Sequence, residues 1–111
     1  MEMSQEELDG GVLKVALSGS FDIAGAGDVD LPLNIIGGSR DKLVVDFTDV
    51  DFLASIGVRV LVKVAKAMSA RNGKIAIINP NDAAAKVLNS TGVDSVIPVV
   101  ADVSAAVEAV S

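Results

Sequence analysis

The chain has 111 residues, a formal net charge of -6, and neither histidine nor cysteine. Without histidine it lacks imidazole acid–base chemistry, histidine triads and histidine metal sites, and without cysteine it lacks disulfides and thiolate metal sites. The excess of acid argues against nucleic-acid binding, which requires a cationic face. Although 50% of the residues are hydrophobic, no apolar run is long enough to cross a bilayer. We therefore expect one domain over residues 1–111 that is cytoplasmic, is not inserted in a membrane, binds no cofactor and is not an enzyme.

The N-terminal part predicts a hairpin followed by a poorly defined helix. Candidate strands at 6–9 and 12–17 flank Gly10-Gly11, a pair that favours a tight turn. Asp22 could cap a helix, but the glycines and Pro32 that follow weaken any helix before Leu33. The pattern predicts a loop and then a helix over about 29–36, with Pro32 in its first turn.

The central part predicts a buried strand that leads into an amphipathic helix. Residues 43–48 form a short apolar run, and helical spacing begins after Ser55 and continues to about residue 70. Between them Asp46, Asp49 and Asp51 are typical turn formers, and Ser55 lies where the helix needs a cap. In the segment 71–73, Gly73 is expected to accept the left-handed conformation that ends the helix.

The C-terminal part continues the alternation of strands and helices. We predict a strand over 74–78, a helix with Asn79 as cap and Pro80 as first residue that ends at Gly92, a strand over 96–99, and a last helix capped by Asp102. The prediction is therefore an α/β fold in which a mostly parallel sheet of four to five strands is opened by an antiparallel hairpin and accompanied by about four helices.

The central helix leaves two valines outside its predicted core face. At 100° per residue, Val58 and Val62 project on the outer half of the helix, near Ser55 and Arg59. They are either packed against a neighbouring element or scattered on the surface, or else they form a docking patch beside a modifiable serine. Ser55 itself is either an ordinary cap, which contributes about 1 kcal/mol, or a site of modification.

The stretch 46–57, DFTDVDFLASIG, resembles the signature of the anti-sigma factor antagonists of the STAS domain family. Segments 17–22, 78–80 and 91–93 are similar to further motifs of that family in the same order. The resemblance implies that Ser55 is phosphorylated and that Val58 contacts a partner. The chain departs from the family pattern at Ala54, Ile56 and Arg59, which replace an Asp, a Ser or Thr, and a frequent Gly.

What the resemblance implies is a phosphorylation-controlled binding module. Its partner would be an anti-sigma factor that is also a serine kinase of the GHKL type, and a metal-dependent serine phosphatase would reverse the modification. The implied contact residues are Phe21, Asp22, Ser55, Val58, Arg59 and Val62.

Two alternatives remain. One is a constitutive STAS adaptor in a signalling or transporter complex. The other is a small-ligand or nucleotide binder that uses the helix N-terminus at Ser55 as an anion site.

Overall fold

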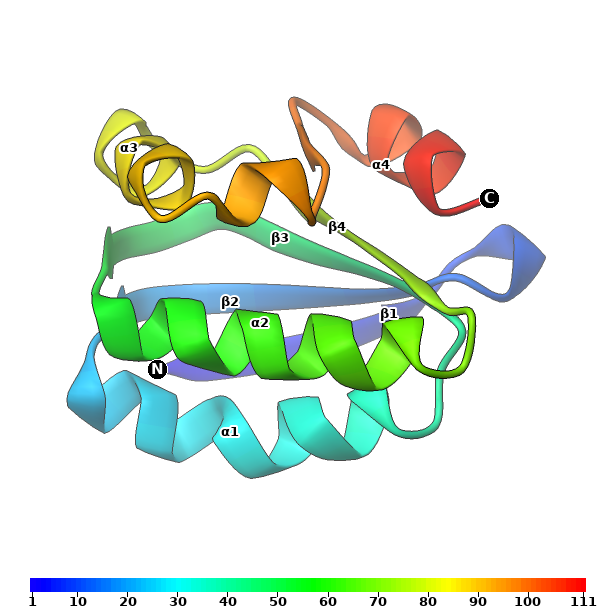
Figure 1. Ribbon diagram of the computed structural model, residues 1–111, viewed down its shortest axis with the longest axis horizontal. Coiled ribbons are helices and arrows are strands. Elements are labelled where there is room, and N and C mark those ends of the chain that lie inside the picture. Colours follow the sequence, from blue (N-terminus) through cyan, green and yellow to red (C-terminus); the bar gives the residue numbers. More distant parts are fainter.

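The computed structural model of residues 1–111 contains one five-stranded sheet with the strand order β1-β2-β3-β4-β5. The first pair of strands is antiparallel and the other three pairs are parallel. Figure 1 shows α1 and α2 running side by side below the sheet and α4 above it. The predicted α/β class, the opening hairpin and the number of helices are confirmed. The elements are β1 (Glu2–Glu7), η1 (Asp9–Gly11), β2 (Leu13–Phe21), α1 (Ile23–Gly37), β3 (Lys42–Leu53), α2 (Ser55–Ser69), β4 (Lys74–Ile78), α3 (Asp82–Ser90), η2 (Val93–Ser95), β5 (Val99–Val100) and α4 (Val103–Val110).

The hairpin turns where it was predicted, but its first strand lies earlier in the chain. Gly10 and Gly11 adopt φ angles of 79° and 78°, a region that glycine enters without steric cost. β1 covers Glu2–Glu7 instead of 6–9 and is almost entirely exposed at the edge of the sheet. The strand was missed because its three glutamates leave no alternation of apolar and polar residues. Charges on an edge strand also discourage pairing with a second chain.

Helix α1 is longer than predicted and starts directly after its cap. Asp22 accepts a hydrogen bond from the Gly25 backbone N–H at 2.9 Å, which confirms the capping role. The helix spans Ile23–Gly37, so Pro32 lies in its interior and not in its first turn. Buried Val29 and Leu33 hold this helix on the sheet, and such packing outweighs low helix propensity.

Strand β3 is twice the length of the predicted run. It extends through Leu53, so Asp46, Asp49 and Asp51 lie inside a strand and do not form a turn. Asp46 instead accepts hydrogen bonds from the Thr48 backbone N–H at 2.9 Å and from its hydroxyl at 2.6 Å. Val50 is buried between the exposed Asp49 and Asp51, and Leu53 is buried at the end of the strand, so this end of β3 stays on the core.

The C-terminal elements follow the prediction with small shifts. β4 and the capping of α4 by Asp102 are confirmed. α3 begins after Asn81, whose side chain accepts from the Ala84 N–H at 2.8 Å, and not after Asn79. Asn72, not Gly73, adopts the left-handed conformation after α2. β5 is limited to Val99–Val100, later than the predicted 96–99.

Two apolar clusters fill the space on the two sides of the sheet. The smaller one joins α4 to the sheet through Ala106 and Val110. The larger one joins β2, β3 and β4 to α1, α2 and α3, and it holds both Phe21 and Phe47, whose ring centroids are 6.3 Å apart. With no buried polar side chain in the chain, the polar groups that remain for function are on the surface.

Candidate functional site

The candidate site lies where α1 and α2 begin. Phe21 and Leu53, the last residues of β2 and β3, are directly paired in the parallel register, so both strands end at the same level. The Ala54 backbone N–H donates to the Phe21 carbonyl at 3.0 Å and fixes the start of α2 against the end of β2. The first turns of the two helices are therefore neighbours at the carboxyl ends of the strands, which is where binding sites of parallel α/β sheets commonly lie.

Ser55 is the first residue of α2 and not its cap. Ala54 occupies the N-cap position and has no side-chain oxygen to offer, so the capping role predicted for Ser55 is wrong. The Ser55 side chain is exposed and makes no hydrogen bond within the chain. The first backbone N–H groups of a helix have no intrahelical acceptor. The hydroxyl thus stands free beside unpaired donors at the positive end of the helix dipole.

Val58 and Phe21 were predicted to contact a partner, but both side chains are inside the protein. Val58 is 7% exposed and belongs to the larger core cluster, so its predicted outward orientation is wrong. Phe21 is 0% exposed. The buried surface of α2 is wider than the side that faces the sheet, because neighbouring elements also cover the flanks of this helix. Both residues belong to the core beneath the start of α2.

The other predicted residues reach the surface to different degrees. Arg59 is exposed one turn after Ser55 and forms no ion pair. Val62 is half-buried, packs against the larger cluster and lines a groove with Val96. Asp22 is half-buried, and one of its oxygens is occupied by the cap of α1. The structure therefore leaves Ser55 and Arg59 exposed and Val62 and Asp22 half-buried.

Two exposed hydrophobic residues near the ends of β2 and β3 were missed from the sequence. Ile23, the first residue of α1, is 82% exposed, and Phe52, next to the end of β3, is 52% exposed. Single exposed apolar residues are ordinary, but these two border the same pair of helix starts. The predicted cap at Asp22 was a signal that Ile23 begins a helix, but nothing in the sequence indicated that its side chain faces solvent.

Gly57 explains how α2 comes so close to the sheet at this end. A Cβ at this position would lie 2.8 Å from Phe21 Cγ and 2.9 Å from Leu53 Cδ1. Both neighbours are buried, so neither has free space to move into. Glycine is therefore required by the close approach of helix and strand, and it fixes the position of Ser55 two residues earlier.

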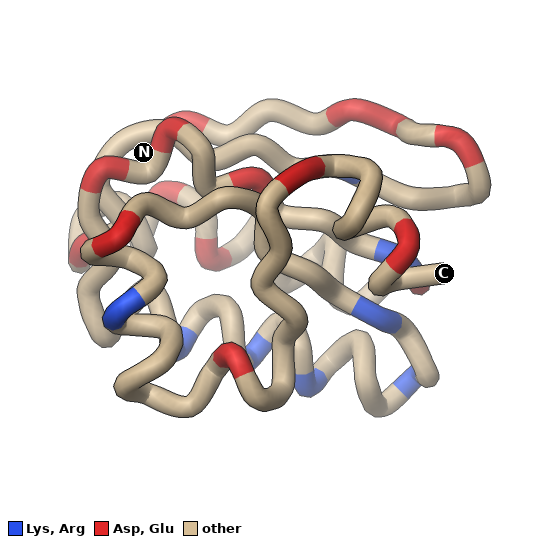
Figure 2. Tube along the Cα trace, turned by 90° about the horizontal axis from the view of Figure 1, so that it is seen from above, with Lys and Arg blue, Asp and Glu red and all other residues tan.

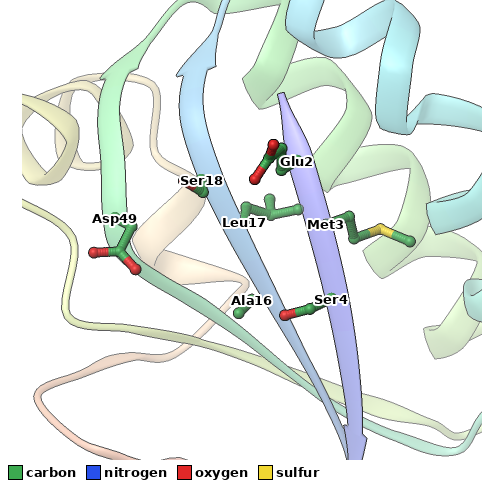
Figure 3. Close-up of a pocket in the computed structure, with 7 residues that line it drawn as sticks. All are labelled: Glu2, Met3, Ser4, Ala16, Leu17, Ser18 and Asp49. Carbon is green, nitrogen blue, oxygen red and sulfur yellow. The ribbon is translucent and has the colours of Figure 1, made fainter.

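The concave parts of the surface do not include Ser55. The depression drawn in Figure 3 has a volume of about 160 Å³ and lies on β1, β2 and β3, where Glu2, Ser4, Ser18 and Asp49 line it. Its acidic lining does not suit an anionic ligand, and it is smaller than the roughly 300 Å³ at which ligand pockets begin. The three further depressions are lined by other residues. Ser55 thus lies on open surface, which suits contact with a macromolecule better than enclosure of a nucleotide.

Charge is unevenly distributed around the sheet. Figure 2 shows acidic positions crowded on the side of the β1–β2 hairpin and several basic positions on the opposite side. The three cations on α2 are Arg59, Lys63 and Lys66, and that helix carries no acid. No group of histidine, cysteine or acidic residues is arranged to hold a metal ion, and none of the helices has the length and apolar character needed to span a membrane.

Comparisons with known proteins agree with this fold. The family model of the STAS domain matches residues 5–106. A candidate anti-sigma factor antagonist of Thermotoga maritima has a similar structure with a TM-score of 0.89 and 22% sequence identity, over 97% of this chain and 93% of that one. An anti-sigma factor antagonist of Mycobacterium paratuberculosis gives a TM-score of 0.87 and 25% identity, over 98% and 92% of the two chains.

The anti-sigma factor antagonist SpoIIAA is a third relative of known structure. Its unphosphorylated form gives a TM-score of 0.79 and 17% identity, over 94% of this chain and 92% of that one. Its phosphorylated form, from Bacillus, gives a TM-score of 0.74 and 17% identity, over 96% and 97%. A search of curated protein sequences gives no match.

Proposed function

Because the chain belongs to the STAS domain family, we propose that it is an anti-sigma factor antagonist whose binding is switched by phosphorylation of Ser55. Unmodified, the domain binds an anti-sigma factor that is also a serine kinase of the GHKL type. Transfer of a phosphate from ATP to Ser55 releases that partner, and a metal-dependent serine phosphatase restores binding.

The observation that carries the proposal is the free hydroxyl at the first position of α2. It is exposed and unbonded, so a kinase can reach it without disturbing the core. The product is also compatible with the fold, because a phosphate at a helix N-terminus meets unpaired N–H groups and a favourable dipole. Arg59 lies four residues further along the same face, where its guanidinium can pair with the added oxygens.

The surroundings of Ser55 supply the surface that phosphorylation would change. Ile23 and Phe52 offer exposed apolar area, with Val62 and Asp22 as partly accessible contacts. A phosphoserine adds a charge of about −1.5 to −2 at neutral pH. A partner whose apolar surface covers Ile23 and Phe52 would have to desolvate that charge, which is costly.

The test is phosphorylation by a GHKL-type kinase, followed by intact-mass analysis. We expect one added phosphate on the wild type and none on Ser55→Ala. Ser69→Ala, which alters an exposed serine at the other end of α2, is the matched control and should be modified like the wild type. A wild type that stays unmodified with every candidate kinase, or a Ser55→Ala protein that is still modified, contradicts the proposal.

A pull-down with Ser55→Asp separates the switch from a constitutive adaptor. The proposal predicts that the aspartate variant recovers much less anti-sigma factor than the wild type does. Ser69→Asp places the same charge at the far end of the helix and should recover as much as the wild type. Equal recovery by Ser55→Asp and wild type would support the constitutive adaptor.

A further inference from the structure

The hydrogen-bond ladder between β4 and β5 ends before it reaches the start of β4. The N–H groups of Ile77 and Asn79 each donate to a carbonyl of the β5 segment at 2.8 Å. Because the hydrogen-bonding groups of a strand alternate between its two edges, Ile75 is the preceding β4 residue that faces β5. The pairing of the two strands nevertheless begins at Ile77 and Val99. The N–H and C=O of Ile75 therefore form no hydrogen bond within the chain.

Two features of the chain before β5 prevent the next pair of hydrogen bonds. In a continued ladder residue 98 would donate to the Ile75 carbonyl, but Pro98 has no N–H. Residue 96 would accept from the Ile75 N–H, but Val96 has φ -114° and ψ -25°, which is not an extended conformation. Both groups of Ile75 thus point to a free edge of the sheet, although this residue is only 6% exposed.

A groove beside α2 leads to this free edge. One depression of about 210 Å³ is lined by Ile75 and by Ala109 of α4. It shares Ala65, Ser69 and Val96 with a second depression of about 370 Å³ that follows the flank of α2. In Figure 1 the start of β4 lies between the end of α2, below it, and α4, above it. The two depressions are adjacent and form one groove of mostly apolar and small residues, which we call the β4 groove.

The charged side chains that line the β4 groove are both lysines. Lys66 is exposed and has no ion-pair partner in the chain. Lys74 donates to the main-chain oxygen of Ser111 at 3.2 Å. No acidic residue lines either depression. The groove therefore favours an occupant with an acidic group, and Lys66 is the cation that is free to pair with it.

We propose that the β4 groove binds an extended segment of a partner protein, which adds to the sheet at Ile75. The backbone of the segment supplies the donor and the acceptor that Ile75 lacks, as in other additions of a strand to an open sheet edge. One apolar side chain of the segment packs against Ala65 and Val96. An acidic side chain two positions away lies on the same face of the segment and pairs with Lys66. This contact uses none of the residues assigned to the Ser55 surface and requires no phosphorylation.

The free backbone groups favour an extended segment over a helix and over a second copy of the chain. A helix uses its backbone N–H and C=O groups internally, so it cannot pair with the edge of a strand. A second copy would offer its own edge strand β1, but β1 is paired with β2 along all six of its residues. Entry of β1 would therefore bring β2 into a space that α2 and α4 flank.

The test is a titration of isotope-labelled protein with three short peptides, followed by two-dimensional NMR. The first peptide is rich in threonine and carries one valine and, two positions later, one glutamate. The second has lysine in place of the glutamate. The third is the glutamate peptide with N-methyl groups on the valine and on the residue after it, so that neither of its edges can donate to Ile75.

The glutamate peptide should bind about fivefold more tightly than the lysine peptide at low salt, because of the charge on Lys66. The N-methylated peptide should bind at least about tenfold more weakly than the glutamate peptide, because it cannot form the strand pairing. The amide resonance of Ile75 should shift strongly when the glutamate peptide binds, since its N–H gains an acceptor.

Paired variants of the protein locate the contact. Val96→Ser removes an apolar side chain from the groove and should weaken binding of the glutamate peptide at least about threefold. Leu31→Ser alters a residue of similar exposure on α1, 70% against 67%, and should bind like the wild type. Lys66→Glu should reverse the preference toward the lysine peptide. Lys86→Glu makes the same exchange at an exposed lysine of α3, outside the groove, and should keep the original preference.

All four substituted side chains are exposed, so the variants are expected to fold. The proposal would be overturned if the glutamate peptide did not bind, if the lysine or N-methylated peptide bound equally well, or if the Ile75 amide did not shift. Equal losses in Val96→Ser and Leu31→Ser, or a preference that Lys66→Glu does not reverse, would also overturn it. Self-association in analytical ultracentrifugation that Val96→Ser abolishes would replace the partner segment with a second copy.

Discussion

Replacing Gly57 by alanine tests whether the close approach of α2 to β2 and β3 positions the start of that helix. The new methyl carbon would lie 2.8 Å from Phe21 Cγ and 2.9 Å from Leu53 Cδ1, well inside normal contact. Overpacking a core in this way costs about 1–3 kcal/mol. The higher helix propensity of alanine returns at most about 1 kcal/mol. We therefore expect Gly57→Ala to lower the free energy of unfolding by about 1–2 kcal/mol.

Urea denaturation followed by circular dichroism measures this loss. With an m-value of about 2 kcal/mol/M, the middle of the usual range, the midpoint should fall by roughly 0.5–1 M. Gly27→Ala is the matched control, because it makes the same exchange in a helix where no atom lies within 4 Å of the new Cβ. That variant should gain about 0.5–1 kcal/mol. If Gly57→Ala were as stable as the wild type, or gained stability like Gly27→Ala, the argument that Gly57 is held by close packing would be refuted.

Three further predictions concern stability and use the same urea assay. Ser55→Ala should change the free energy of unfolding by less than about 0.5 kcal/mol because its hydroxyl makes no hydrogen bond, and a loss near 1 kcal/mol would restore the capping role. Asp22→Ala should lose about 0.5–2 kcal/mol, because this carboxylate caps α1, and an unchanged midpoint would contradict it. Arg71→Ala should lose about 1–3 kcal/mol, because the Arg71 guanidinium donates to the carbonyls of Gly37 at 2.7 Å and Arg40 at 2.6 Å. A loss below about 0.5 kcal/mol would show that solvent replaces these hydrogen bonds.

The sequence was most informative where local rules and tertiary packing agree. The turn at Gly10-Gly11, the strand β4 and the cap at Asp102 were predicted correctly, because glycine conformation, buried apolar runs and capping oxygens act within a few residues. They depend little on the rest of the chain. The resemblance to the STAS family added the overall arrangement, which no single segment indicates.

Helix α1 shows why local rules fail elsewhere. Its glycines and Pro32 argue against a helix, yet the chain is helical from Ile23 to Gly37. Gly37 lies against α2, where an added Cβ would be 3.1 Å from Val64 Cγ1. A small residue is needed here for helix packing, and that need is visible only when both helices are in place.

The orientation of Val58 could not be obtained from helical periodicity. The 3.6-residue period identifies the stripe of α2 that faces the sheet, but α2 also has neighbours along its flanks. Val58 therefore joins the core at 7% exposure, whereas Val62, one turn later, stays half-buried. Sequence analysis placed Ser55 and Arg59 on the surface correctly and assigned too much of the apolar contact to α2.

The burial of Val58 and Phe21 changes how the proposed switch would act. If the apolar contacts of the partner lay on Val58, phosphorylation would have to expose or hide a core residue, and the switch would involve partial unfolding. With Val58 fixed in the core and Gly57 packed on Phe21, the first turn of α2 has a rigid support below Ser55. A phosphate added there changes the charge of a preformed surface at the start of α2. The modified and unmodified domains should therefore share one backbone structure and differ chiefly in what they can bind.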